Sequence, residues 1–481
     1  MKRRRHRYKL IALFLFACFL GTGIWGVWSV RHYGTRWFAH ASNTRLTAQK
    51  DLVAEGNILD RNGTMLASTA DGSRVFRDNA DDRASIVHII GDRKGQIANS
   101  VESFHAGYLY GYQSSLLDAV HNLISKTGRR GNDLTLTIDA DLCTDIVRGF
   151  SSHDITKGKN GAAAVVNWST GELLALVSLP SFDPDRVTDE EIESLDQPYW
   201  NRATQAVYPP GSTFKIVTAA SFLSSSPEAA ETTFTCTGSL VVSDSFTVKD
   251  FNNASHGALT LRQAFAKSCN SIFASIALNL GDSALRKTAE SFGFNENFLF
   301  RDLVLYNSSY PRNDQSRDAL AASGYGQSAI AVTPLHMCLI SAAVANNGVM
   351  REPRLLKTVK SSSGSTVLGW SSYDARTVCG AETARTLQIM MKDVVQGGGS
   401  GSGAAVAGLD IRGKTGTSES TSGGSRINYG WFTGYNAQSD LPFAVCVLVE
   451  DIPDGETGGT TAALIARDIF TYLKNHPDRV L

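Results

Sequence analysis

The sequence of 481 residues predicts an α/β protein of the α+β type, in which helices flank a mainly antiparallel sheet, with a short membrane-proximal N-terminal domain and one transmembrane helix. Three observations predict this organisation: an uncharged apolar run near the N-terminus, a strand pair further along the chain, and helical patterns after which strand patterns return. The composition, 42% hydrophobic and 19% charged, is typical of a globular protein and excludes a disordered chain or a polytopic membrane protein.

The apolar run covers Leu10–Val30 and contains 21 residues without a charge. A helix of that length rises about 30 Å, which is the thickness of a bilayer core. Six Lys and Arg side chains and no acid precede it, so the positive-inside rule predicts residues 1–9 as a cytoplasmic tail, residues 10–30 as the transmembrane anchor and all later residues outside the cytoplasm. Because a cleaved signal peptide has a shorter apolar core of about 7–15 residues, we expect an uncleaved, single-pass anchor in the cell membrane.

The part after the anchor divides into a small and a large predicted domain. Residues 31–138 form the membrane-proximal N-terminal domain, with an Asn62-Gly63 hairpin signal and an alternating strand pattern at Asp133–Ile138. Residues 139–481 form the large domain. Beyond residue 30 the chain has 40 basic and 46 acidic side chains, and this net charge of −6 argues against a nucleic-acid partner.

The large domain opens with two apolar strand patterns, Ala162–Trp168 and Glu172–Leu179, joined by a Ser-Thr-Gly turn. Helical patterns follow at Ser212–Phe222, Thr260–Leu280, Thr333–Asn346 and Glu382–Val395. Strand patterns return at Val406–Arg412, Tyr429–Tyr435 and Phe443–Glu450, and a last helical pattern covers Thr460–Asn475. This order predicts the α/β domain with a mainly antiparallel sheet.

The cysteines and histidines show no recognisable metal-binding motif. Six of the seven cysteines follow the apolar run, widely spaced and without a C-x-x-C pair, and the ten histidines include no H-E-x-x-H. We therefore expect no metal site. Six cysteines allow 15 full pairings, and both buried free thiols and disulfides stay open.

Ser212-Thr213-Phe214-Lys215 is the one S-x-x-K sequence in the chain. Side chains three residues apart share one face of a helix, so the Ser212 hydroxyl and the Lys215 amine can meet. The preceding Pro-Pro-Gly places Ser212 at a helix start, where backbone N–H groups favour a developing oxyanion. Lys215 can act as a base only when neutral, which requires burial or a second cation to lower its pKa from about 10.4. An ordinary amphipathic first turn would have the same spacing.

Two further polar patterns lie far along the chain. Ser268-Cys269-Asn270 carries a hydroxyl and an amide that can face one cleft only where the backbone leaves the helical conformation. In Lys414-Thr415-Gly416-Thr417 the lysine and hydroxyls can hold a carboxylate, and the glycine allows another backbone to approach closely. Lys126-Thr127-Gly128 repeats the K-T-G pattern, and we interpret it as a surface turn.

Gly408–Thr415 also fits the G-x-x-x-x-G-K-T pattern of a phosphate-binding loop. Such a loop requires a helix directly after it. Residues 416–426 are instead rich in Gly and Ser and poor in helix formers, so we do not expect a nucleotide site.

The order S-x-x-K, S-x-N and K-T-G resembles that of the penicillin-recognising serine acyl transferases. Other stretches are similar to class B penicillin-binding proteins: Gly56–Ala67, Asn201–Lys215, Gly324–His336, Gly413–Glu419 and Gly430–Tyr435. The resemblance implies a serine β-lactamase/D,D-peptidase-like fold, with residues 139–481 as the penicillin-binding transpeptidase domain and residues 31–138 as a pedestal or dimerisation-like domain. Glu55 stands where the pattern of this family has arginine.

The resemblance also implies a peptidoglycan D,D-transpeptidase that cross-links stem peptides without a metal or organic cofactor. Ser212 would attack the carbonyl of the penultimate D-Ala and form an acyl-enzyme, and Lys215 would take the serine proton. Ser268 and Asn270 would relay a proton to the leaving group and orient the donor peptide. β-Lactams mimic D-Ala-D-Ala and would acylate and inhibit the same serine.

Four residues of the K-T-G sequence complete the implied site. Lys414 and Thr415 would hold the motif strand and, with Thr417, the substrate carboxylate, while Gly416 would admit the neighbouring backbone. The charge of Lys414 would help to keep Lys215 neutral. The N–H groups of Thr417 and of the nucleophile would form the oxyanion hole.

Three other activities share these motifs. A D,D-carboxypeptidase would release D-Ala to water, and a serine β-lactamase would need an added carboxylate, for which we find no convincing motif. A β-lactam-sensing ectodomain would need a cytoplasmic effector, whereas nine residues precede the predicted span. Because class B proteins resembling this chain serve cell shape and cell division beside a membrane-embedded glycan polymerase of the RodA/FtsW type, we expect such a partner at the anchor and residues 31–130.

Overall fold

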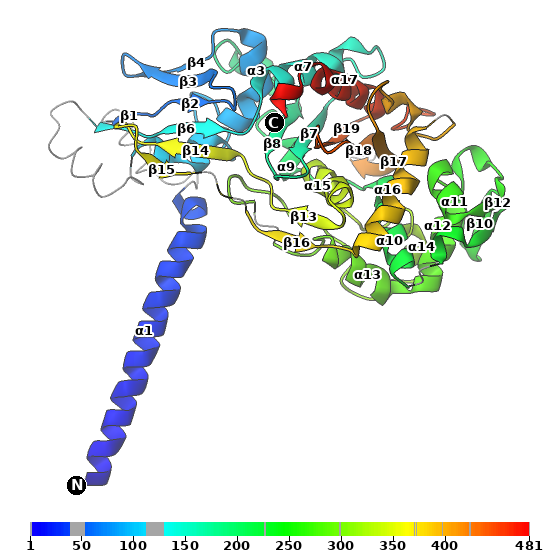
Figure 1. The fold of residues 1–481 in the computed structure, drawn as a ribbon, viewed down its shortest axis with the longest axis horizontal. Coiled ribbons are helices and arrows are strands. Elements are labelled where there is room, and N and C mark those ends of the chain that lie inside the picture. The colour runs from blue at the N-terminus through cyan, green and yellow to red at the C-terminus, as the bar shows by residue number, and fades with distance from the viewer. Residues whose placement is uncertain are drawn as a thin grey trace.

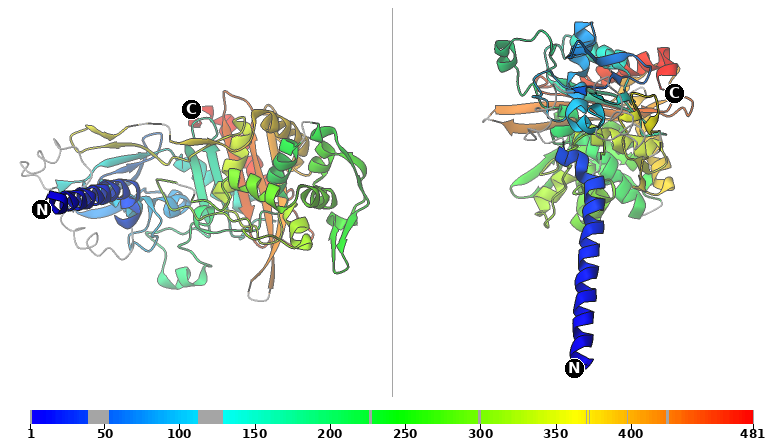
Figure 2. Two further views of the ribbon diagram at one scale, coloured as in Figure 1. Left: turned by 90° about the horizontal axis from the view of Figure 1, so that it is seen from below. Right: turned by 90° about the vertical axis from the view of Figure 1, so that its left-hand side faces the viewer.

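The computed structural model describes residues 2–480 except residues 39–52, 112–128, 226–227, 298–299, 370, 372, 397 and 423–424. A long helix, α1 (Lys2–Phe38), projects away from a folded body that contains two larger sheets (Figure 1, Figure 2). The second K-T-G sequence, Lys126-Thr127-Gly128, lies outside the described residues.

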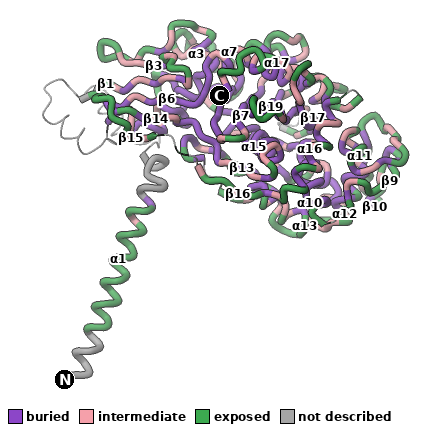
Figure 3. The backbone as a smooth tube through the Cα atoms, viewed as in Figure 1, coloured by how far each residue is buried: buried purple, intermediate pink, exposed green. Residues whose placement is uncertain are grey.

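Helix α1 contains one segment that is long and apolar enough to cross a membrane. Lys9–Ser29 is 21 residues long and has a mean hydropathy of 2.2, and its apolar window is not buried against the body. Figure 3 shows this helix exposed over most of its described length. By length and composition this helix could cross a bilayer, and the anchor at residues 10–30 stays a prediction.

The first sheet joins N-terminal strands to two strands from the middle of the chain, in the order β15-β14-β6-β2-β3-β4. β2 (Ile58–Leu59) and β3 (Met65–Ala70) form the hairpin predicted around Asn62-Gly63. β14 (Leu356–Lys360) and β15 (Thr366–Leu368) extend this sheet from within the predicted large domain. The other elements of this region are β1 (Val53–Ala54), β4 (Ser73–Phe76), β5 (Arg129–Arg130), β6 (Asp133–Leu136), α3 (Ala80–Ile90), α4 (Val101–Phe104) and α5 (Ala106–Leu109).

Arg61 connects the hairpin of this sheet to distant parts of the chain. Its guanidinium donates to the carbonyls of Thr137 at 3.4 Å and Val480 at 3.3 Å, and lies 3.8 Å from the Glu172 carboxylate. Asp60 accepts the N–H groups of residues 62 and 64, which closes the turn beside Arg61. The hairpin therefore helps to hold the first sheet against the larger body.

The second sheet has five antiparallel strands in the order β17-β18-β19-β7-β8. β7 (Gly161–Asn167), β8 (Leu173–Leu179) and β19 (Phe443–Val449) are buried along their whole length. Because helices cover both of their faces, these strands do not alternate and are apolar except at Asn167 and Ser178. β17 (Ile411–Ser422) and β18 (Ser425–Asn436) form a long hairpin at one edge. The mainly antiparallel sheet with flanking helices is confirmed.

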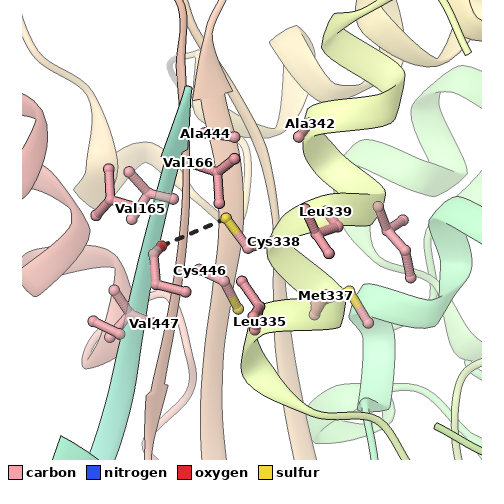
Figure 4. Close-up of a cluster of buried hydrophobic side chains, with 14 of the residues drawn as sticks. Val165, Val166, Leu335, Met337, Cys338, Leu339, Ala342, Ala444, Cys446 and Val447 are labelled. Carbon is pink, nitrogen blue, oxygen red and sulfur yellow. Dashed lines mark hydrogen bonds between the residues drawn. The ribbon is translucent and has the colours of Figure 1, made fainter. Parts of the chain in front are cut away.

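Helices form a layer on each face of this sheet. α7 (Ala140–Ser152) and α17 (Ala462–Asn475) pack together over β8, β18 and β19, and α15 (Pro334–Ala345) packs on the other side (Figure 1). Figure 4 shows side chains of α15 directed at β7 and β19, with the Cys338 thiol 3.5 Å from the carbonyl oxygen of Ala164.

The cysteines of this core are not cross-linked. All seven cysteines of the sequence lie in the described part of the chain and are free thiols: Cys18, Cys143, Cys236, Cys269, Cys338, Cys379 and Cys446. Five of them are buried, which favours the free-thiol alternative that the sequence left open.

A third group of elements lies beside α15 and the β17 edge. It contains η2 (Gly211–Phe214), α10 (Lys215–Ser225), α11 (Leu261–Lys267), α12 (Asn270–Leu280), α13 (Asp282–Ser291), α14 (Arg317–Ser323) and α16 (Ala381–Val395). A small lobe is built from two strand pairs: β9 (Thr233–Cys236) with β12 (Gly257–Thr260), and β10 (Ser239–Ser243) with β11 (Phe246–Lys249). The short connecting elements are α8 (Asp189–Ser194), α9 (Arg202–Gln205), β13 (Val349–Arg351), β16 (Ala375–Thr377), η3 (Ala229–Glu231), η4 (Phe251–Asn253), η5 (Ser402–Ala404) and η6 (Pro477–Arg479).

Two predicted elements differ from the structure. The strand predicted at Val406–Arg412 is wrong, because β17 begins at Ile411 and runs through the polar sequence to Ser422. Gly408, with φ of +85°, interrupts the extended backbone before it, and continuous pairing with β18 holds the polar residues in the strand. The helix predicted at Thr260–Leu280 is two helices, α11 and α12, separated at Ser268.

Candidate active site

Ser212 lies in a tight turn that passes directly into a helix. The turn is the 3-10 helix η2, which continues into α10 at Lys215, so the predicted helix start is correct and its first turn is tighter than an α-helix. Gly211 has φ of +53°, and a Cβ there would come within 2.5 Å of the Thr417 carbonyl oxygen. Its N–H donates to the carbonyl of Gly326 at 2.9 Å. These close backbone contacts hold the half-buried Ser212 beside β17.

The Lys215 amine is the centre of the polar contacts around Ser212. Its Nζ lies 3.0 Å from Ser212 Oγ, 2.7 Å from Asn270 Oδ1 and 2.6 Å from the Ser268 carbonyl oxygen. Ser268 Oγ is 3.2 Å away, and the ring of Phe273 lies 5.5 Å from the amine. The first two predicted motifs therefore meet at one lysine that has no exposed surface.

The turn between α11 and α12 directs Ser268 and Asn270 towards this lysine. Ser268 adopts a left-handed conformation, with φ of 58° and ψ of 38°, and ends α11. The Asp250 carboxylate accepts the N–H groups of Asn270 and Ser271 and the hydroxyl of Ser271, so it caps α12 from another segment. This is the non-helical backbone that the S-x-N spacing requires. Asp250 was not identified from the sequence, where no motif marks it.

The K-T-G strand forms the opposite wall. Lys414 Nζ lies 2.9 Å from Ser268 Oγ and 2.9 Å from the Thr415 carbonyl oxygen, and the side chain is fully buried. A Cβ on Gly416 would come within 2.9 Å of the Pro210 carbonyl oxygen and of the Thr213 methyl, so a glycine is needed for β17 to approach η2. The close backbone approach expected at this glycine is therefore present.

Burial controls the charge of the two lysines. It lowers the pKa of Lys215 to about 7, against a weaker opposing effect of nearby acidic groups. Burial, with the neighbouring Lys215 second, lowers the pKa of Lys414 well below its usual value. With Ser268 Oγ counted for both, Lys215 has four close oxygen partners and Lys414 has two, so the proton favours Lys215. The expectation that a charged Lys414 keeps Lys215 neutral is replaced by neutralisation through burial.

A cleft of about 810 Å³ opens above this group. Among its lining residues are six of the eight predicted site residues: Ser212, Ser268, Asn270, Thr415, Gly416 and Thr417. The two buried lysines contact this lining from within the protein. The lining also includes Tyr325, Gln327 and Ser400, of which Ser400 shares a 2.7 Å hydrogen bond with Thr415. Tyr325 and Gln327 belong to the Gly324–His336 stretch, which the sequence marked without assigning individual residues.

This arrangement provides a hydroxyl in contact with an amine whose pKa lies near neutral pH. Such a pair can act as a nucleophile and its base, and a second hydroxyl between two amines can pass a proton. At the Ser268–Asn270 turn lie four side chains of types that bind metals, Cys236, Asp250, His256 and Cys269, of which Asp250 and His256 also line the cleft.

Comparisons with known proteins agree with this geometry. A family model for the penicillin-binding protein transpeptidase domain matches residues 161–471. The chain is 32% identical over 329 residues to the peptidoglycan D,D-transpeptidase PbpA of Mycolicibacterium smegmatis, a match that covers 64% of this chain and 65% of that protein. It is 30% identical over 397 residues to the peptidoglycan D,D-transpeptidase MrdA of Acinetobacter baumannii, covering 75% of this chain and 57% of that protein. The match therefore spans less than two thirds of either relative.

A solved structure shares the fold over nearly its whole length. An acyl-enzyme complex of penicillin-binding protein A from M. tuberculosis superposes with a TM-score of 0.78 and 26% identity, covering 88% of this chain and 99% of that one.

Proposed function

The chain belongs to the penicillin-binding protein transpeptidase family, and we propose that it is a serine D,D-transpeptidase that cross-links peptidoglycan stem peptides. The observation that carries the proposal is the contact of Ser212 Oγ with Lys215 Nζ at 3.0 Å, at the floor of a cleft that the S-x-N and K-T-G residues line. β-Lactams are proposed to acylate the same serine. The roles of the individual residues and the domain boundary between residues 138 and 139 are part of this proposal.

Acylation begins with neutral Lys215. Its amine takes the proton of Ser212 Oγ as that oxygen attacks the carbonyl carbon of the penultimate D-Ala. The N–H groups of Ser212 and Thr417 stabilise the oxyanion of the tetrahedral intermediate. The C–N bond then breaks, and the leaving amine of D-Ala receives a proton through Ser268, whose Oγ lies within 3.2 Å of both lysine amines.

The acyl-enzyme then reacts with an amine of a second stem peptide. The amine loses a proton to the same Lys215–Ser268 pair and attacks the ester carbonyl. The C–O bond to Ser212 then breaks and Ser212 Oγ takes a proton back from Lys215, so that one amide bond replaces another. Asn270 is proposed to hold the donor peptide, because its Oδ1 is occupied by Lys215 while its amide borders the cleft. Thr415 and Thr417 are proposed to hold the substrate carboxylate, and Gly416 to admit the neighbouring turn.

The proposed function is tested by the fate of the acyl-enzyme. The purified full chain is incubated with a pentapeptide donor and an amine acceptor, and the products are separated by mass. We expect cross-linked product in excess of the tetrapeptide released by water. Release to water alone would indicate a D,D-carboxypeptidase, and rapid turnover of penicillin would indicate a serine β-lactamase; either result would reject the transpeptidase.

The position in the cell forms a further part of the proposal. The exposed apolar segment Lys9–Ser29 supports a single-pass membrane anchor. The six basic side chains before it favour a cytoplasmic N-terminus with the catalytic body outside. A membrane-embedded glycan polymerase of the RodA/FtsW type is proposed as the partner that supplies glycan strands. Replacing residues 1–130 with an unrelated anchor and spacer should abolish its co-purification, and undiminished recovery would reject these contacts.

Topology gives a first prediction. We expect protein isolated from membranes to keep residues 1–38, because the apolar segment is longer than a signal-peptide core. Protease added to intact spheroplasts should digest the body but spare a tag at the N-terminus. An N-terminal sequence that starts beyond the apolar segment would show cleavage instead.

A second prediction concerns pH. Since Lys215 has a pKa of about 7 and acts as a base only when neutral, the rate of penicillin acylation should rise with pH, reach half its maximum near pH 7 and level off above it. Lys414→Ala should slow acylation because Ser268 Oγ loses a 2.9 Å contact. It should leave the midpoint in place, because burial is the main cause of the lowered Lys215 pKa.

The direction in which Lys414→Ala shifts the pH midpoint of acylation distinguishes burial from charge repulsion as the cause of the lowered Lys215 pKa. If a protonated Lys414 repelled the charge on Lys215, its removal would raise the Lys215 pKa and move the midpoint to higher pH. A rise of about one pH unit in Lys414→Ala would therefore contradict neutralisation by burial. Lys126→Ala, in the second K-T-G sequence, is the matched control and should change neither the rate nor the midpoint.

A further inference from the structure

Four side chains of the small lobe and the adjoining helix bring one metal-binding atom each to a common centre. The ligand atoms of Cys236, Asp250, His256 and Cys269 all lie within 4.8 Å of one another. Cys236 ends β9, Asp250 follows β11, His256 precedes β12, and Cys269 is the N-cap of α12. The antiparallel pairing of β9 with β12, in which Cys236 opposes Gly257, brings the first and third of these residues together.

We propose that this cysteine–histidine group binds one zinc ion. Cys236 Sγ lies 3.2 Å from Asp250 Oδ2 and 3.2 Å from His256 Nδ1, and Cys269 Sγ lies 3.5 Å from the same carboxylate oxygen. A tetrahedral zinc ion with ordinary bond lengths separates sulfur from nitrogen or oxygen ligands by about 3.5 Å, and two sulfurs by about 3.8 Å. The three separations of 3.2, 3.2 and 3.5 Å lie at or about 0.3 Å below the first value, and all four atoms lie within 4.8 Å of one another, so small side-chain movements would bring them to the spacing of a zinc cage.

The contacts within the group converge on one carboxylate oxygen. Asp250 Oδ2 is approached by both thiols and, at 2.6 Å, by the Ser271 hydroxyl. The Cys236 thiol also lies 3.2 Å from His256 Nδ1, so hydrogen bonds can hold these side chains together without an ion, and a cation would take the place of the thiol protons. Asp250 Oδ1 meanwhile accepts two backbone N–H groups, the kind of outer contact that orients a metal-binding carboxylate.

The ligand types and their burial select a structural zinc site. Two sulfurs, an imidazole and a carboxylate form a set that zinc accepts and that calcium or magnesium, which prefer oxygen, would not. Cys236 and Cys269 are buried, with 1% and 0% of their surface exposed, whereas His256 is half-buried. Four protein ligands leave no open coordination position, so the ion is assigned to holding the fold and not to chemistry on substrate.

A metal cross-link would stabilise this lobe, whose own hydrophobic core is small. The buried apolar cluster under β10 and β11 is small and consists of Val242, Val248, Ala274 and Ala321. A metal bound by both the lobe and α12 would supplement this limited core. Cys269 also lies between Ser268 and Asn270, so the ion would fix the turn that directs both side chains at Lys215. The ligands are thus positioning residues, and this consequence, unlike the metal binding itself, rests on the proposed function.

Metal content is the first test. The full chain is purified from membranes in detergent without chelator, and its metals are measured by inductively coupled plasma mass spectrometry. We expect about one zinc ion per chain, reduced at least tenfold in Cys236→Ser and in His256→Ala. Cys379→Ser, which changes a half-buried thiol outside the group, is the matched control and should keep its zinc. A wild-type chain without zinc, or unchanged zinc in both variants, would overturn the proposal.

Zinc titration is the second test, and it remains informative if a variant folds poorly. The wild-type chain is stripped with a chelator under reducing conditions and titrated with zinc chloride alone. At 100 times the dissociation constant we expect the melting temperature to rise by about 3 °C. No rise, or a disulfide between Cys236 and Cys269 found by mass spectrometry of the unreduced protein, would reject the zinc site.

The acylation assay separates the two proposals. Stripped protein should react with penicillin at least threefold more slowly than zinc-loaded protein. Equal rates, with zinc bound and the melting temperature raised, would overturn only the positioning role. A zinc-loaded protein that never forms an acyl-enzyme would reject the transpeptidase and leave the metal site intact.

Discussion

Ser212→Ala is expected to abolish acylation by penicillin and the cross-linking reaction. The substitution removes the Oγ atom that contacts Lys215 at 3.0 Å, and no other hydroxyl occupies its position in the 3-10 turn η2. Loss of an enzyme nucleophile that acts as a unit with its base costs about 10⁶-fold in turnover in a well-studied serine hydrolase. We expect a loss of at least that order, below the detection limit of fluorescent penicillin labelling.

The fold should not change with this substitution. Ser212 is half-buried at the cleft floor, and the backbone contacts that hold the turn come from Gly211 and Gly326. The melting temperature should therefore stay within about 1 °C of the wild type. Ser328→Ala, an exposed serine that lines the same cleft, is the matched control and should label normally. A labelled peptide that contains any serine other than Ser212 would reject the assigned nucleophile.

Lys215→Ala is expected to have the second largest effect. Without the amine, Ser212 has no base within hydrogen-bonding distance among its described contacts, and general-base catalysis contributes roughly 10²–10⁴-fold. The acylation rate should fall by that factor, and the rise in rate near pH 7 should disappear because the group with that pKa is gone. Stopped-flow measurement of penicillin acylation between pH 5 and 10 checks both effects.

Two further variants test whether Lys215 acts as a base or only supplies a positive charge. Lys215→Arg keeps a cation at the site, but a guanidinium does not deprotonate in this range, so it should be nearly as inactive as alanine. Lys267→Ala, an exposed lysine at the cleft, should keep both the rate and the pH profile. If Lys215→Arg acylates within tenfold of the wild type, Lys215 supplies charge and not a base. The melting temperature reports any loss of packing separately.

Local sequence patterns predicted most of the regular structure. Apolar runs marked β7, β8 and β19, since strands covered on both faces are apolar at nearly every position. The Thr333–Asn346 and Glu382–Val395 patterns match α15 and α16 within one residue at each end. The long apolar segment near the N-terminus was equally clear, because its length and lack of charge are properties of a single stretch of chain.

The sequence patterns misplaced β17 and the break between α11 and α12, because both depend on contacts with other segments of the chain. β17 is polar over most of its length, and its extended form comes from backbone pairing with β18, which no side-chain pattern reveals. The non-helical backbone at Ser268 was predicted from the need for the Ser268 and Asn270 side chains to face one cleft, and not from the helix propensity of the residues. It is held by Asp250, which lies 20 residues before Asn270 in the sequence and caps α12 across a tertiary contact.

The sequence by itself determined which side chains we propose to carry the chemistry, because a serine, a lysine and an amide in a fixed order form a local and recognisable pattern. Only the tertiary structure decided that they meet: Ser268 is 53 residues from Lys215 and 146 from Lys414, and both amines lie within 3.2 Å of its hydroxyl. It also decided the charges, since burial and not the second lysine lowers the pKa of Lys215. The sequence did not reveal the cysteine–histidine group, because its members also come together only in the tertiary structure. Cys236 is 14 residues from Asp250 and 20 from His256, and strand pairing, which follows backbone hydrogen bonds rather than sequence spacing, brings them together.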